Sequence, residues 1–150
     1  MSKKVVAVIP ARMASSRYPG KPIIEILGLP MIEHVRRRVE KMDFIDDVIV
    51  ATCDQEIKDL VKSNGGRVIM TADTHERATD RIEEAMQGIE ADVVINVQGD
   101  EPMVMAEPIK NLVTPFLESE DVGCTCLVYP IKDHSELDSD NIVKTVMSSS

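Results

Sequence analysis

The amino-acid sequence predicts an α/β fold, in which a mostly parallel sheet carries helices on both faces and forms three layers. Short apolar runs alternate with segments of helical periodicity along the chain, and the connections between them are short. The first run, Val5–Ile9, is apolar at every position, which is typical of a central parallel strand covered on both faces. A chain of 150 residues, 43% of them hydrophobic, can build this core, and we expect one domain over residues 1–150.

Strands and helices are predicted in a regular order. The predicted strands cover Val5–Ile9, Val48–Ala51, Arg67–Met70, Val93–Val97, Val122–Val128 and Ile142–Met147. The predicted helices extend over about Met31–Lys41, from an N-cap at Asp54 to Gly65, through Ile82–Ile89, and from Pro108 to Phe116. In such a sheet, ligands bind beyond the carboxyl ends of strands, near a switch in strand order. Two polar motifs of this sequence lie at such strand ends.

The first motif is the segment Pro10–Pro22, which comes directly after the first strand and reads PARMASSRYPGKP. Its small residues let backbone N–H groups approach an anion closely, and they are Ala11, Ala14, Ser15, Ser16 and Gly20. Arg12, Arg17 and Lys21 supply positive charge, although the whole chain has a formal net charge of -9. A surface loop with three solvated cations is the alternative, but this combination favours a polyphosphate site.

Two common phosphate motifs are absent from the sequence. Gly20-Lys21 is followed by proline and lacks the upstream glycine of the G-x-x-x-x-G-K-[ST] loop, and no G-x-G-x-x-G is present. The sequence therefore supports neither a P-loop ATPase nor a dinucleotide-dependent dehydrogenase.

The second motif, Gln98–Pro102, comes directly after the predicted strand Val93–Val97. A carboxylate just past the end of a central strand is well placed to hold Mg²⁺ against a nucleotide phosphate, and Asp100 is that carboxylate. Because glycine, aspartate and proline are turn formers, a plain β-turn is the alternative. Together with the cationic segment, the motif favours metal binding.

Composition argues against several other classes of protein. The chain is acidic and only 3% aromatic, so a nucleic-acid partner is not expected, and Arg36–Arg38 is interpreted as the solvated face of an amphipathic helix. Without an apolar run of membrane-spanning length or a signal peptide, we expect a cytoplasmic protein that is not membrane-bound. Cys124 and Cys126 are expected to be buried reduced thiols, with a redox pair as the alternative.

Three segments together carry a resemblance to a known family: Pro10–Pro22, Met31–Val35 and Val94–Pro102. They resemble the CMP-Kdo synthetases, which are 3-deoxy-manno-octulosonate cytidylyltransferases, and the similarity extends through Lys144. The first segment is typical of sugar cytidylyltransferases in general, whereas N-V-Q-G-D-E-P is typical of the Kdo branch. The resemblance implies a Rossmann-like nucleotidyltransferase fold.

The resemblance also implies a reaction and a set of site residues. Such enzymes join CTP to an eight-carbon 2-keto sugar acid, release pyrophosphate and serve lipopolysaccharide biosynthesis. By this likeness, Asp100 holds Mg²⁺, and Gln98 faces the sugar. The nucleotide-binding residues would be Ala11, Arg12, Ser15, Arg17, Lys21, Arg77 and Thr79, with Arg12 and Lys21 on the triphosphate and Arg17 assisting. With Asp100, Arg12 and Lys21 would form the catalytic set.

The sequence departs from this family at the segment that resembles its cytosine-contacting pattern, Ser-Gly-Thr-(Asp/Glu)-Arg. Thr79–Arg81 matches, but Arg77 and Ala78 replace the serine and the glycine. Because alanine has less backbone freedom than glycine, base recognition or sugar choice is expected to differ. His34 and His75 are interpreted as structural residues.

The second departure is length, because the family continues for much of another lobe beyond Ser150. That lobe resembles the supplier of a second metal-binding aspartate, most sugar contacts and much of a homodimer interface. We therefore expect a fold truncated after its sixth strand, with a dimer interface weakened or altered. The alternatives are a non-catalytic or partner-completed CTP-binding module, and a cytidylyltransferase for a sialic-acid-like sugar or a phosphonate.

Overall fold

The computed structural model describes residues 3–14 and 18–147. Its main sheet has four strands: β1 (Val5–Ala11), β4 (Asp47–Thr52), β5 (Arg67–Met70) and β6 (Val93–Asn96). The helices are α1 (Met31–Val39), α2 (Gln55–Ser63), α3 (Ala78–Met86), α4 (Ala106–Glu118) and the short α5 (Ser135–Asp138). A 3-10 turn, η1 (Lys21–Ile23), precedes a two-stranded hairpin of β2 (Glu25–Ile26) and β3 (Leu29–Pro30). In these described ranges, no helix is long and apolar enough to cross a membrane.

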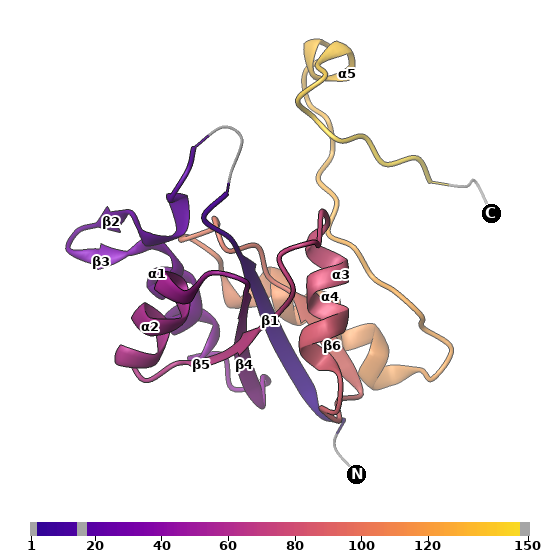
Figure 1. Cartoon of the computed structure of the whole chain (residues 1–150). Coiled ribbons are helices and arrows are strands. Elements are labelled where there is room, and N and C mark those ends of the chain that lie inside the picture. The colour runs from indigo at the N-terminus through magenta and orange to yellow at the C-terminus, as the bar shows by residue number, and fades with distance from the viewer. Residues whose placement is uncertain (1–2, 15–17, 148–150) are drawn as a thin grey trace.

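The strand order of the main sheet is β5-β4-β1-β6, and all of its pairings are parallel (Figure 1). In the central strand, Val8 is in register with Ile49 of β4 on one side and with Asn96 of β6 on the other. The chain runs outward from β1 to β4 and β5, and then returns to the other side of β1. The strand order therefore switches between β1 and β6, which is where such sheets bind ligands.

Alternate residues of β1 enter two separate apolar layers. Val5, Ala7 and Ile9 pack in a core that also contains buried residues of α1, α2 and α4. Val6 and Val8 face the opposite way, into a smaller core shared with α3. Helices thus cover both faces of the sheet, which confirms the predicted three-layer α/β class and explains why β1 is apolar at successive positions.

The prediction of two strands near the C-terminus is wrong. Residues 122–128 and 142–147 have no strand conformation. Residues 123–127 line a groove beside β6 without pairing to it, and the chain beyond them runs away from the sheet (Figure 1). An apolar pattern forms a strand only beside a partner for its backbone groups, and the main sheet ends at β6 without pairing to either segment. The predicted burial of Cys124 and Cys126 is wrong for the same reason, because both thiols are exposed.

The solvated face predicted for residues 36–38 is wrong for Arg36. Its side chain is 3% exposed, and its Nε and Nη2 atoms each donate a hydrogen bond of 2.7 Å to the Glu33 carboxylate. Arg36 also donates to the backbone carbonyl of Asn64 at 3.0 Å, which ties α1 to the end of α2. The hydrogen bonds that Arg36 donates to Glu33 raise the pKa of its guanidinium above its ordinary value. Arg37 and Arg38 are exposed, as predicted.

Candidate functional site

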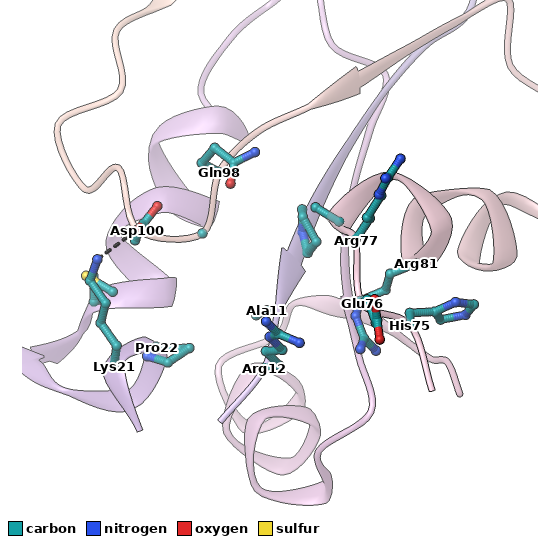
Figure 2. Close-up of a pocket in the computed structure, with 14 residues that line it drawn as sticks. Ala11, Arg12, Lys21, Pro22, His75, Glu76, Arg77, Arg81, Gln98 and Asp100 are labelled. Atoms are coloured by element: carbon teal, nitrogen blue, oxygen red, sulfur yellow. Dashed lines mark hydrogen bonds and ion pairs between the residues drawn. The ribbon is translucent and has the colours of Figure 1, made fainter. Parts of the chain in front are cut away.

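A pocket of about 270 Å³ opens beyond the carboxyl ends of β1 and β6, at the switch in strand order. Four short segments supply most of its lining: residues 10–12, 21–22, 75–78 and 98–100. Figure 2 shows Lys21 and Asp100 on one side of this pocket, and His75, Glu76, Arg77 and Arg81 on the other. The pocket therefore has two walls of different chemistry, which we name the Lys21 wall and the His75 wall.

Gly99 allows the ends of β1 and β6 to approach each other closely. The pairing continues one residue past β6, where the Val97 amide donates to the Val8 carbonyl at 3.0 Å. A Cβ atom on Gly99 would lie 2.9 Å from the backbone oxygen of Pro10, closer than side chains tolerate. The glycine thus serves close packing of two backbones, and this packing carries Asp100 to the rim of the pocket.

The cationic segment is closed at its base by backbone hydrogen bonds. The Gly20 amide donates to the Met13 carbonyl at 2.9 Å, and Gly20 has a φ of +74°, which favours glycine. The Met13 amide in turn donates to Asp54 Oδ2 at 2.8 Å. Asp54 occupies the N-cap position of α2, as predicted, but its side chain makes no capping hydrogen bond. Instead, its carboxylate anchors the segment, a role that sequence reasoning missed.

The predicted phosphate-binding lysine and the predicted metal-binding aspartate contact each other. Lys21 Nζ lies 2.6 Å from Asp100 Oδ2, and the side chains are 41% and 50% exposed (Figure 2). Each charge neutralises the other, yet both remain open to the pocket. This wall can therefore bind an anion through Lys21 and a cation through Asp100, in adjacent positions.

The structure brings together six of the predicted site residues. Ala11, Arg12, Lys21, Arg77, Gln98 and Asp100 all line the pocket. Thr79 does not: it lies in a neighbouring groove beside β6, which Gln98 also lines. Ser15 and Arg17 lie outside the described residues. His34 contacts the backbone carbonyl of Ile26 at 2.7 Å, which fits its interpretation as a structural residue.

Comparisons with known proteins agree with one another. A family model described as Cytidylyltransferase matches residues 6–150. The chain is 43% identical over 143 residues to 3-deoxy-manno-octulosonate cytidylyltransferase from Geobacter metallireducens, and 39% identical over 143 residues to the Trichlorobacter lovleyi protein of that name. These alignments cover 95% of this chain but 56% and 57% of the two relatives, so the chain spans little more than half of their length.

The chain is also similar to solved structures. The chain is similar to the structure of CMP:2-keto-3-deoxy-manno-octonic acid synthetase complexed with CTP, with a TM-score of 0.77 and 44% identity, over 79% of this chain and 49% of that one. A cytidylyltransferase from Leptospira borgpetersenii has a TM-score of 0.69 at 24% identity, over 79% of this chain and 51% of that one, which shows a shared fold.

Proposed function

Because this chain belongs to the cytidylyltransferase family, we propose that its residues 1–150 form the nucleotide-binding part of an enzyme that transfers CMP from CTP to a 2-keto-3-deoxy sugar acid of the Kdo type. The observation that carries this proposal is the pocket itself. It places Arg12, Lys21 and Asp100 together at the switch in strand order. The names of the relatives and of the CTP complex support the choice of nucleotide and sugar.

We assign the triphosphate to Arg12 and Lys21. Both line the pocket, and both lie at the ends of segments whose backbone is fixed, by β1 and by η1. Charge-assisted hydrogen bonds to phosphate oxygens are among the strongest that side chains make. Arg17 is proposed to assist, with Ala11 and Ser15 offering close approach to the backbone. Gln98 is proposed to face the sugar.

A magnesium ion is proposed at Asp100, and the donor chemistry fits this ion. Mg²⁺ prefers oxygen ligands, and it is commonly held by one or two carboxylates together with substrate phosphates and water. Asp100 offers such a carboxylate beside the proposed phosphate position, and residues 3–14 and 18–147 contain no cluster of three metal-ligating side chains that would make an all-protein site. When bound, the ion would neutralise charge on the phosphates.

The proposed reaction is a substitution at phosphorus. The oxygen of the anomeric hydroxyl forms a bond to the α-phosphorus of CTP, the bond from that phosphorus to pyrophosphate breaks, and the hydroxyl proton passes to water. Little covalent chemistry is required of the protein, so catalysis consists mainly of alignment and charge neutralisation. In this chain, Arg12 and Lys21 are the residues that would bind and orient the phosphates.

Family membership supports four further elements of the proposal. Arg77 and Thr79 are proposed to contact the nucleotide. A homodimer is proposed, to be tested by sedimentation of the purified chain. The proposed reaction belongs to lipopolysaccharide biosynthesis in the cytoplasm, which cell fractionation would test.

The experiment that tests the function incubates the purified chain with CTP, Mg²⁺ and Kdo, and measures pyrophosphate release beside calorimetric titration of CTP. UTP in place of CTP is the matched nucleotide control, and a sialic acid in place of Kdo tests the alternative sugar. Pyrophosphate release that requires both CTP and Kdo is the expected result. CTP binding without pyrophosphate release would favour the alternative, a non-catalytic CTP-binding module. The absence of CTP binding would contradict both the enzyme and the module.

A further inference from the structure

Most of the His75 wall belongs to a segment that has no regular secondary structure, and Ala78 and Arg81 of α3 complete it. Residues 71–77 connect β5 to α3, and seven residues without a helix or strand would ordinarily adopt many conformations. The first residue is fixed, because the Thr71 amide donates to the Thr52 carbonyl at 2.9 Å and so extends the sheet. Two side chains of α3 hold the next part of the segment.

The first of these side chains is Arg81, which is 3% exposed although it carries a charge. Its Nη1 atom donates to the hydroxyl of Thr71 and, at 3.2 Å, to the backbone carbonyl of Ala72. A buried guanidinium is retained only where its donors find partners. These contacts fix the start of the segment.

The second side chain is Glu84, three residues further along the same helix. Its carboxylate accepts a hydrogen bond from the Ala72 amide, at 2.9 Å and 3.1 Å to its two oxygens. Its Oε2 atom also contacts His75 Nε2. These two contacts keep the pKa of Glu84 below its ordinary value, with the His75 contact as the larger cause and the Ala72 amide next. Residues three apart lie on one face of a helix, so Arg81 and Glu84 act on the segment from the same side.

The two walls are expected to face different parts of a nucleotide. The Lys21 wall offers an ammonium group at the position proposed for phosphate, whereas the His75 wall combines the carboxylate of Glu76 with the guanidinium of Arg77. Ala78 adds a methyl group to that wall, and His75 adds an imidazole ring. If the triphosphate lies against Arg12 and Lys21, the nucleoside lies against the His75 wall.

We propose that Arg81 and Glu84 are positioning residues that hold residues 71–75 in place and thereby preset the wall of the pocket that receives the nucleoside. The proposal rests on the proposed CTP binding. Glu84 does not line the pocket, and Arg81 lines it with a side chain that is only 3% exposed. Nη1 of Arg81 and both carboxylate oxygens of Glu84 are already bonded to the segment. A preset wall binds more tightly because its ordering is completed before the ligand arrives.

The proposal separates affinity for the nucleoside from affinity for phosphate. Glu84→Ala removes the carboxylate that contacts Ala72 and His75, and Arg81→Met removes the guanidinium that contacts Thr71 and Ala72. Glu83→Ala is the matched control, because Glu83 is an exposed glutamate on the same helix. CTP and inorganic tripolyphosphate are titrated separately into each variant. We expect the Kd for CTP to rise about tenfold in the two test variants, with a change of about twofold or less for tripolyphosphate and for the control. Glu84→Gln, which keeps an acceptor for the Ala72 amide, is expected to recover part of the CTP affinity.

Hydrogen exchange provides a readout that does not depend on nucleotide binding. In Glu84→Ala, the Ala72 amide loses its acceptor, so residues 72–77 are expected to exchange faster while the amides of β1 and β4 do not change. Unchanged exchange at Ala72, or an equal loss of CTP and tripolyphosphate affinity, would overturn the proposal. If the wild-type chain binds no CTP, the proposed function fails, while faster exchange in Glu84→Ala would still establish the contact. Should Glu84→Ala fail to fold, Arg81→Met carries the comparison of CTP with tripolyphosphate.

Discussion

Lys21 Nζ and Asp100 Oδ2 lie 2.6 Å apart, although the two residues are separated by 79 positions in the sequence. The pair joins the end of the cationic segment to the turn after β6. Because the side chains are 41% and 50% exposed, solvent screens the pair, and its contribution to stability is expected to be about 1 kcal/mol or less. Its position in the pocket points instead to ligand binding.

Lys21→Ala is expected to weaken CTP binding far more than it lowers stability. Loss of a charge-assisted phosphate contact typically reduces affinity about tenfold or more, whereas loss of a half-exposed ion pair changes the free energy of unfolding by about 1 kcal/mol or less. Calorimetric titration and thermal unfolding measure the two effects. Lys62→Ala, an exposed lysine on α2, changes the net charge equally and serves as control. Parallel losses of affinity and melting temperature would contradict this prediction.

Asp100→Asn is expected to act in opposite directions with and without magnesium. In a chelator, the variant should bind CTP as tightly as the wild type or about threefold more tightly, because Asp100 no longer repels phosphate or engages Lys21. With Mg²⁺ present, the variant should bind about tenfold more weakly, because it lacks the carboxylate ligand. Glu101→Gln, at the exposed neighbouring position, is the control. If the ratio of the Kd in chelator to the Kd with Mg²⁺ is the same in Asp100→Asn as in the wild type, Asp100 does not hold the ion.

Gly99→Ala is expected to destabilise the fold. The new Cβ atom would lie 2.9 Å from the Pro10 carbonyl oxygen and 3.3 Å from Ile32 Cδ1, so backbone must shift. Overpacking of this kind costs about 1–3 kcal/mol, or roughly 3–10 °C in melting temperature. Gly123→Ala is the matched control, because a Cβ atom there meets nothing within 4 Å. Equal melting temperatures for the two variants would show that β1 and β6 are not held this closely.

His75→Ala is expected to raise the pKa of Glu84 toward its ordinary value, because the His75 contact is the main cause of its depression. A carboxyl group with a depressed pKa stabilises the folded chain above its unfolded-state pKa. That contribution is lost as the pH falls through the folded-state pKa, in the range below about pH 4.3. Carboxyl-carbon NMR titration measures the pKa directly, with Glu83 as internal reference. A Glu84 pKa that stays the same in the variant would show that His75 does not hold the carboxylate.

Much of the sheet is predictable from the sequence because its central strands are apolar on both faces. The continuous run in β1 predicts a buried strand, and β5 forms over the predicted bounds, Arg67–Met70. The same reasoning fails at residues 122–128, because an apolar pattern reports a capacity for pairing but not the presence of a neighbouring strand. Arg36 illustrates a related limit, since its buried position depends on Glu33 and on the end of α2.

The sequence predicts which strand ends carry the candidate site, but it does not predict how the segments there are held in place. Parallel topology places the segments after β1 and β6 at one edge, which is why Arg12 and Asp100 are expected near each other. The residues that shape these segments escape sequence reasoning. Asp54 holds Met13 and Glu84 holds Ala72 through backbone amides, and a carboxylate that accepts from a distant N–H group leaves no pattern in the sequence.

The location of CTP on this chain is the most direct test of the proposed site. The measurement is a two-dimensional amide NMR titration of the isotope-labelled chain with CTP and Mg²⁺. We predict that the amides most strongly shifted belong to residues 11–12, 20–21, 75–78 and 98–100, which line or border the pocket. Shifts centred on the exposed cations of α1, Arg37 and Arg38, or no shifts at all, would contradict a CTP site between β1 and β6.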